Sequence, residues 1–117
     1  MKIAAMVIAA ALACGPALAD TWSGVYEGTI LSTYDDGRTA KVYVNADHSY
    51  SVVLKDGTVL KGNWADAGGQ SCFTLTDPPA APGSKPTCFP VREYKVGDSF
   101  EGEDSTGKFT GVIQAGR

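Results

Sequence analysis

The chain has 117 residues, with ten basic residues against thirteen acidic ones and a formal net charge of −3 at pH 7. These charges are scattered rather than blocked, which argues against nucleic acid and against anionic membrane surfaces as partners. The length allows one domain with a modest core. Fourteen glycines, together with frequent valine, threonine and tyrosine, favour β structure.

Residues 1–19 have the form of a signal peptide. Lys2 gives a positive start, residues 3–13 form an apolar run too short to span a bilayer, and Ala17-Leu18-Ala19 is a small-x-small cleavage site. We therefore expect residues 20–117 to form a single domain in the periplasm or outside the cell. They contain no apolar stretch long enough to cross a membrane.

Cys14 offers an alternative to cleavage after Ala19. It lies in Ala11-Leu12-Ala13-Cys14-Gly15, which loosely resembles the lipobox of bacterial lipoproteins, although a lipobox prefers leucine where Ala11 stands. If Cys14 is lipidated, the protein is instead a lipoprotein tethered to a membrane.

Three similar turns organise the first half of the predicted domain. Asp35-Asp36-Gly37, Ala46-Asp47-His48 and Lys55-Asp56-Gly57 each separate two alternating segments, which predicts three-residue hairpin loops. Asp suits such turns because its side chain accepts hydrogen bonds from local amides, and His48 stands where the other two loops have glycine. The register follows by counting: Ile30 pairs with Val42, Val44 with Tyr50, and Val52 with Leu60.

The pairing places one apolar face inward. Its members are all even-numbered, whereas the odd-numbered positions are mostly polar. They are Trp22, Gly24, Tyr26, Gly28, Ile30, Ala40, Val42, Val44, Tyr50, Val52, Leu54, Leu60, Gly62 and Trp64. A two-residue turn at Gly68-Gly69, or a four-residue loop around it, then brings Trp64 opposite Phe73 and makes odd-numbered residues face inward.

Cys72 and Cys88 are the only other cysteines, and their spacing is unlike a redox motif or a zinc site. We expect them to form a disulfide on the outward face. Four prolines keep the segment between them from pairing as a strand, so it is predicted to be a surface loop and the most plausible contact surface for a protein partner. The residues named for that role are Asp77, Pro78, Pro79, Pro82, Lys85 and Pro86.

The last third predicts another hairpin, Asp98–Glu103 with Lys108–Gln114, joined near Ser105-Thr106-Gly107. Phe100 is expected to face Val112 or Ile113, depending on the loop length. About eight strands in up-and-down order result, without a helix. We expect an all-β, antiparallel meander that forms a small lipocalin-like barrel or a half-open one.

No catalytic, cofactor-binding or metal-binding pattern stands out. His48 is predicted at a turn tip and the cysteines in a disulfide, while the acidic residues Glu101, Glu103 and Asp104 fit an exposed strand. We expect a non-enzymatic protein without a cofactor.

The inward face carries small residues among aromatic ones, which could leave a cavity for a small apolar or aromatic ligand. In the alternative, favoured because the domain is small, the glycines relieve curvature and the aromatic rings simply pack. The candidate ligand-facing residues are Trp22, Tyr26, Gly28, Tyr50, Gly62 and Trp64.

Three segments, Trp22–Thr29, Asn45–Tyr50 and Asp56–Trp64, resemble the opening strands of small bacterial envelope barrels, in particular the N-terminal domain of NlpE-type lipoproteins. That family carries a C-x-x-C after its first strand, where this chain has Ile30–Thr33, so roles tied to those cysteines are not implied.

In size, export and single disulfide the chain also resembles lipocalin-like periplasmic inhibitors of secreted proteases. Those inhibitors act through a segment that precedes the barrel, and only Asp20 and Thr21 precede Trp22 here. We therefore expect an envelope protein that binds a small apolar ligand or a protein partner. The alternative is an inhibitor of a secreted protease or other hydrolase.

Overall fold

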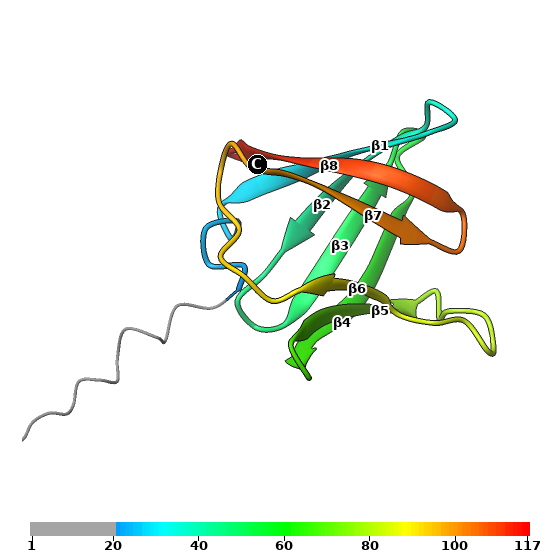
Figure 1. Cartoon of the computed structure of the whole chain (residues 1–117). Helices are drawn as coiled ribbons and strands as arrows, with labels where there is room; N and C mark the ends of the chain where they lie inside the picture. Colours follow the sequence, from blue (N-terminus) through cyan, green and yellow to red (C-terminus); the bar gives the residue numbers. More distant parts are fainter. Residues whose placement is uncertain (1–20) are drawn as a thin grey trace, which may run out of the picture.

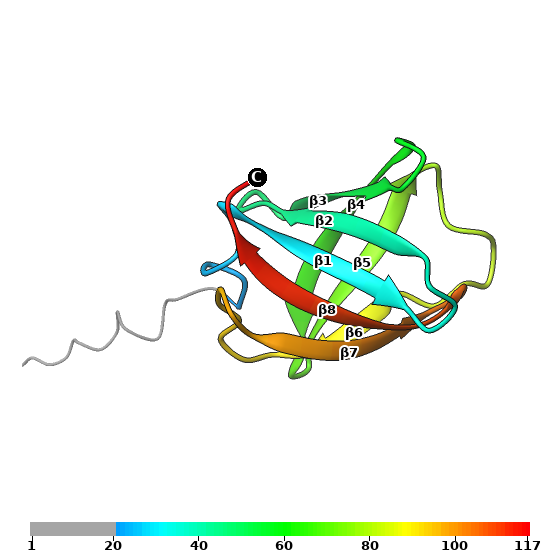
Figure 2. The same cartoon turned by 90° about the horizontal axis from the view of Figure 1, so that it is seen from above.

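A computed structural model describes residues 21–117; the predicted leader and Cys14 lie outside the described residues. Eight antiparallel strands curl into a nearly closed barrel (Figures 1 and 2), with the sheet order β6-β5-β4-β3-β2-β1-β8-β7. This confirms the predicted all-β meander. The strands are β1 (Gly28–Tyr34), β2 (Thr39–Val44), β3 (Ser49–Leu54), β4 (Val59–Ala67), β5 (Gln70–Asp77), β6 (Thr87–Pro90), β7 (Ser99–Asp104) and β8 (Gly107–Ala115).

The three predicted hairpin loops are confirmed. The residue in the left-handed region is Gly37, His48 or Gly57, with φ of 93°, 72° and 92°. The ladders pair Ile30 with Val42, Val44 with Tyr50, and Val52 with Leu60, as counted from the sequence.

Aspartates stabilise these loops locally. The carboxylates of Asp36 and Asp56 accept hydrogen bonds from the amides of Arg38 and Thr58, and Asp47 accepts one from the hydroxyl and one from the amide of Ser49. These bonds hold the pKa of all three carboxyl groups below the usual range. The aspartates are therefore turn residues, as the sequence predicted.

In the second half of the sheet the inward-facing residues change from even-numbered to odd-numbered positions, as predicted. Gly68 and Gly69, both with positive φ, form a two-residue turn, and Trp64 lies opposite Phe73. Cys72 lies directly opposite Cys88 on the outward face, where the two form the expected disulfide between β5 and β6. The disulfide thus attaches the short strand β6 to the longer strand β5.

Residues 22–27 do not begin the first strand, so the alternating inward placement predicted for them is wrong. They form two consecutive turns, in which the amide of Val25 bonds to the carbonyl of Trp22 and the amide of Gly28 to the carbonyl of Val25, each at 2.8 Å. The segment lies across one end of the barrel beside the 91–98 connection (Figure 1). Trp22 and Val25 are consequently both buried, while Gly24 is exposed.

The last hairpin adopts neither of the two registers that the sequence left open. Asp104 pairs with Gly107 across a two-residue turn, so Phe100 faces Gly111 rather than Val112 or Ile113. Asp104 fixes this turn because its carboxylate accepts hydrogen bonds from the amide and hydroxyl of Thr106, at 2.8 and 2.6 Å. A Cβ at position 111 would lie 2.7 Å from the Phe100 ring, so this register needs glycine there.

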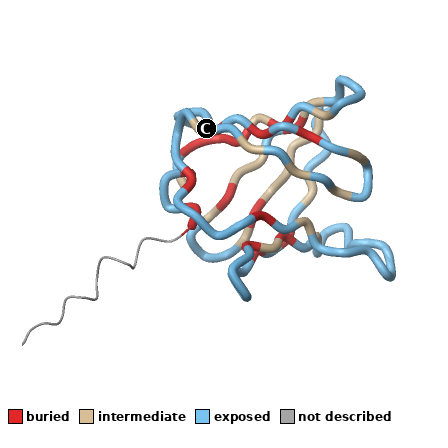
Figure 3. The backbone as a smooth tube through the Cα atoms, in the orientation of Figure 1, coloured by how far each residue is buried: buried red, intermediate tan, exposed pale blue. Residues whose placement is uncertain are grey.

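The core is concentrated toward the end closed by residues 21–27, and the loops at the opposite end are exposed (Figure 3). Its most buried members are Trp22, Val25, Val44, Tyr94 and Ile113. β6 and β7 stand at the two ends of the sheet order and are not paired with each other. The rings of Phe89 and Phe100, 5.2 Å apart edge to face, close this seam from the inside.

Candidate functional site

A cavity of about 620 Å³ occupies the interior of the barrel. Its lining reaches the turns after β1, β3 and β7 and the loop after β5, so it opens at the end opposite residues 21–27. The volume falls within the range of about 300–1,000 Å³ typical of small-molecule sites.

The walls of the cavity are aliphatic and aromatic side chains from every strand. They follow from the alternation of the sequence, which turns one apolar side chain in two toward the barrel axis. Four of them, Val52, Leu54, Leu60 and Leu75, point inward and yet are only half-buried. The other main contributors are Ile30, Ala40, Val42, Phe89, Phe100 and Phe109.

Trp22 forms the floor. Its indole is fully buried, stacks on Tyr94 with ring centroids 4.2 Å apart, and donates a hydrogen bond to the hydroxyl of Ser71 at 2.7 Å. Tyr94 in turn donates from its hydroxyl to the carbonyl of Pro90 at 2.7 Å. Both polar atoms of the two rings therefore have partners, and the floor is closed by packed aromatic rings.

The structure brings only part of the predicted ligand-facing set to the cavity. Trp22 and Tyr50 line it, whereas Gly62 lies beneath the Tyr50 ring, where an added Cβ would come 2.6 Å from Cε1. At Gly62 the structure agrees with the alternative in which the aromatic rings simply pack, because the Tyr50 ring fills the space that a side chain at position 62 would take.

The other predicted residues lie elsewhere. Trp64 stacks on the exposed His48 with centroids 4.1 Å apart, and its indole donates to the carbonyl of Asn45 at 3.0 Å. Tyr26 and Gly28 line a separate hollow at the closed end. Sequence reasoning placed Tyr26 inward because it extended the first strand back to Trp22, whereas that strand begins only at Gly28.

The proline-rich loop lies at the mouth of the cavity. Of the residues predicted for partner contact, Pro78, Pro79, Lys85 and Pro86 contribute to the lining. Asp77 instead pairs with Lys61 in the ladder between β4 and β5, and Pro82 is exposed outside the lining. The loop is therefore part of the entrance to the barrel interior.

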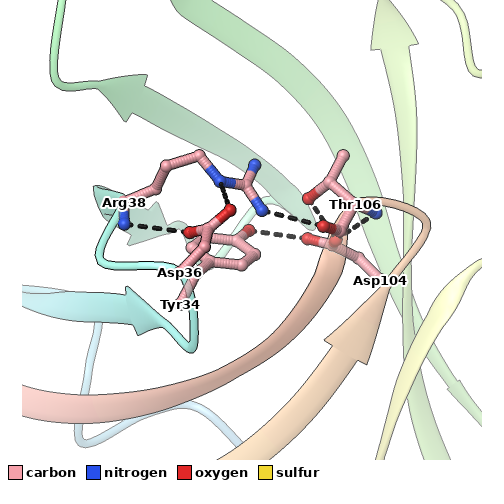
Figure 4. Close-up of polar contacts among 5 residues, drawn as sticks. All are labelled: Tyr34, Asp36, Arg38, Asp104 and Thr106. Atoms are coloured by element: carbon pink, nitrogen blue, oxygen red, sulfur yellow. Dashed lines mark hydrogen bonds and ion pairs between the residues drawn. The ribbon is translucent and has the colours of Figure 1, made fainter.

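A polar cluster on the opposite side of the mouth was missed by sequence reasoning (Figure 4). The hydroxyl of Tyr34 donates to Asp104 at 2.6 Å, and the guanidinium of Arg38 lies 4.4 Å from the centroid of the Tyr34 ring. Arg38 also donates to the carboxylate of Asp36 at 2.7 Å and to the carbonyl of Thr106 at 2.8 Å. Burial, followed by the bond to Asp104, raises the pKa of Tyr34 well above its usual range.

Ser32 and Tyr50 are buried residues of the lining, and their hydroxyl groups form no hydrogen bond with another of the described residues. Burial, with the Asp104 carboxylate as a lesser cause, raises the pKa of Tyr50 to about 12. Both hydroxyls are therefore neutral and available to a ligand.

Within residues 21–117, no group of three or more His, Cys, Asp or Glu side chains is arranged to hold a metal ion. The same residues include no helix with the length and apolar character needed to span a bilayer. Comparison of the chain with protein-family models, curated proteins and solved structures finds no match. The chemistry of the cavity is therefore the basis on which a function can be inferred.

Proposed function

We propose that this protein is an exported, non-enzymatic β-barrel that binds a small apolar or aromatic ligand in its interior. The observation that carries the proposal is the half-burial of Val52, Leu54, Leu60 and Leu75, which point inward around about 620 Å³ of space. Covering such side chains gains about 25 cal/mol for each Å² of apolar surface removed from water. Binding of a ligand that fills this space is thus favourable, because the ligand covers the apolar side chains around it.

Two observations support export and the absence of catalysis. The Cys72–Cys88 disulfide is typical of an oxidising compartment and engages both thiols of the barrel. His48, the only histidine, stacks on Trp64 at the closed end and lines no part of the cavity. Among the described residues, no imidazole therefore faces the proposed ligand.

Titration with N-phenylnaphthylamine, a neutral apolar fluorophore, tests the proposal. Its fluorescence should rise on binding, and Val52→Phe should weaken binding at least tenfold because the new ring occupies the cavity. Val53→Phe is the matched control, since Val53 is the next residue on β3 and faces outward. The proposal fails if the wild-type protein does not enhance the fluorescence, or if both variants weaken binding equally while remaining folded by circular dichroism.

Inhibition of an exported hydrolase is the alternative function, and contact with a protein partner through the 78–86 loop would serve it. It finds less support, because Thr21 and Trp22 are buried at the closed end and are not free to enter an active site. Thr21 is further held by a hydrogen bond from its hydroxyl to Asp66 at 2.6 Å.

A further inference from the structure

We infer that the ligand is a single-chain amphiphile with an anionic head, whose alkyl chain lies in the barrel while the head lies at the mouth beside Lys55 and Lys85. This inference depends on the proposed function and adds the class and the orientation of the ligand. It comes from the distribution of charge around the cavity.

The mouth of the cavity carries charged groups of both signs. The charged residues that line it are three cations, Arg38, Lys55 and Lys85, and two carboxylates, Asp56 and Asp104. The chain as a whole carries a formal net charge of −3. With Asp36, which is paired with Arg38, cations and carboxylates around the mouth are equal in number, so the charge available to a ligand depends on which groups lack a partner.

Three of these five groups already have partners. Arg38 is paired with Asp36 at 2.7 Å, and Asp104 accepts hydrogen bonds from Tyr34 and Thr106. Asp56 accepts a hydrogen bond from the amide of Thr58 at 2.9 Å. These groups are held in local structure and are poorly placed to bind a ligand head.

The two lysines differ from the other three groups. Within residues 21–117, neither Lys55 nor Lys85 forms an ion pair or a side-chain hydrogen bond, and both are exposed. They come from different segments, the β3–β4 turn and the 78–86 loop, which both contribute to the mouth. Flexible ammonium groups on two sides of an opening are suited to an anionic head of varied geometry.

The interior fixes the orientation. Below the mouth the lining is apolar apart from neutral hydroxyls such as those of Ser32 and Tyr50, and it contains no cation. An anion in that space would lose its hydration without gaining a counter-charge, which is strongly unfavourable. An alkyl chain is instead favoured there, because it has no charge to desolvate and covers the apolar lining. The chain therefore enters the barrel and the head stays outside.

Displacement of bound N-phenylnaphthylamine from the mature protein tests the inference with three probes of equal chain length. Dodecanoate, dodecanol and dodecyltrimethylammonium would each be titrated below the micelle concentration. Dodecanoate should bind most tightly and the cationic probe least tightly. Because exposed ion pairs contribute modestly, each lysine is expected to change dodecanoate affinity about two- to fivefold.

Lys55→Gln combined with Lys85→Gln should therefore weaken dodecanoate binding about four- to twenty-fivefold and change the binding of the uncharged dodecanol by a much smaller factor. Lys41→Gln combined with Lys108→Gln removes the same charge from outward-facing strand positions and should have no comparable effect. Higher salt should reduce the preference for dodecanoate.

Two results would overturn the inference while leaving the proposed function intact: equal binding of dodecanoate and dodecanol by the wild-type protein, or equal weakening of dodecanoate binding in the two double variants. A wild-type protein that binds neither the fluorophore nor any of the three probes would refute both the inference and the proposed function.

Discussion

The hydroxyl of Tyr34 donates a 2.6 Å hydrogen bond to the carboxylate of Asp104, which joins the end of β1 to the end of β7 at the mouth of the barrel. The two residues are seventy positions apart and belong to strands that both flank β8. The first hairpin and the last are thereby held together where the cavity opens.

This bond should appear as a coupling energy. In a double-mutant cycle of Tyr34→Phe and Asp104→Ala, we expect the two losses in the free energy of unfolding to be non-additive by about 1 kcal/mol, as for a partly buried hydrogen bond to a charged group. Urea unfolding of the four proteins measures the coupling. Strictly additive losses would show that the bond makes no net contribution.

Removal of the aromatic floor should destabilise the barrel strongly. Trp22→Ala deletes a fully buried indole that stacks on Tyr94, and a loss of about 3–5 kcal/mol in the free energy of unfolding is expected. Val96→Ala, at the same end but 51% exposed, is the control and should change stability by less than about 0.5 kcal/mol. Chemical denaturation compares them, and similar losses would contradict the placement of Trp22.

Loss of the disulfide should lower stability without abolishing ligand binding. Cys72→Ser combined with Cys88→Ser reopens a loop with a sequence separation of 16, for which loop-closure entropy predicts a loss of about 3 kcal/mol. The sulfurs lie outside the cavity, so fluorophore affinity should be retained in the folded fraction. An unchanged denaturation midpoint would mean that the bridge does not constrain the unfolded chain.

Stability should fall in strongly alkaline solution. Burial raises the pKa of Tyr50 from 10.0 to about 12, so between these values the unfolded chain releases a proton that the folded barrel retains. The stabilising contribution is complete below pH 10.0 and is lost as the pH rises toward about 12. Tyr50→Phe should flatten that decline, and Tyr43→Phe, on the outward face, should not. Urea unfolding at a series of pH values, with tyrosinate absorbance, checks the difference.

The local part of the fold was predictable from the sequence. Each three-residue loop specifies its register, and a slip of one residue would turn Val52 or Leu60 to the outside, so alternation and turn chemistry agree. The same reasoning failed over residues 22–27, because Trp22 and Val25 are buried at the spacing of consecutive turns, which an alternating pattern does not describe. It also failed at Asp104–Gly107, a sequence that fits a loop of either two or three residues.

The candidate site was less accessible to sequence reasoning. The inward apolar pattern is the same whether a barrel is filled or hollow, because the free volume depends on the number, tilt and stagger of all the strands. The cluster of Tyr34 with Asp104 requires the pairing of β1 with β8 and of β8 with β7, which no local signal predicts. Sequence reasoning singled out residues of the mouth, such as Lys85 and the prolines, but it could not show that they lie together there.

The unpaired seam between β6 and β7 has a consequence for the range of ligand sizes that the barrel can bind. Parting these two edges separates aromatic rings but breaks no ladder between the strands. The Cys72–Cys88 disulfide meanwhile keeps β6 attached to β5. We therefore expect the barrel to widen on this side, so that bulkier ligands are accommodated by a wider seam rather than by rearrangement of the seven strand pairings.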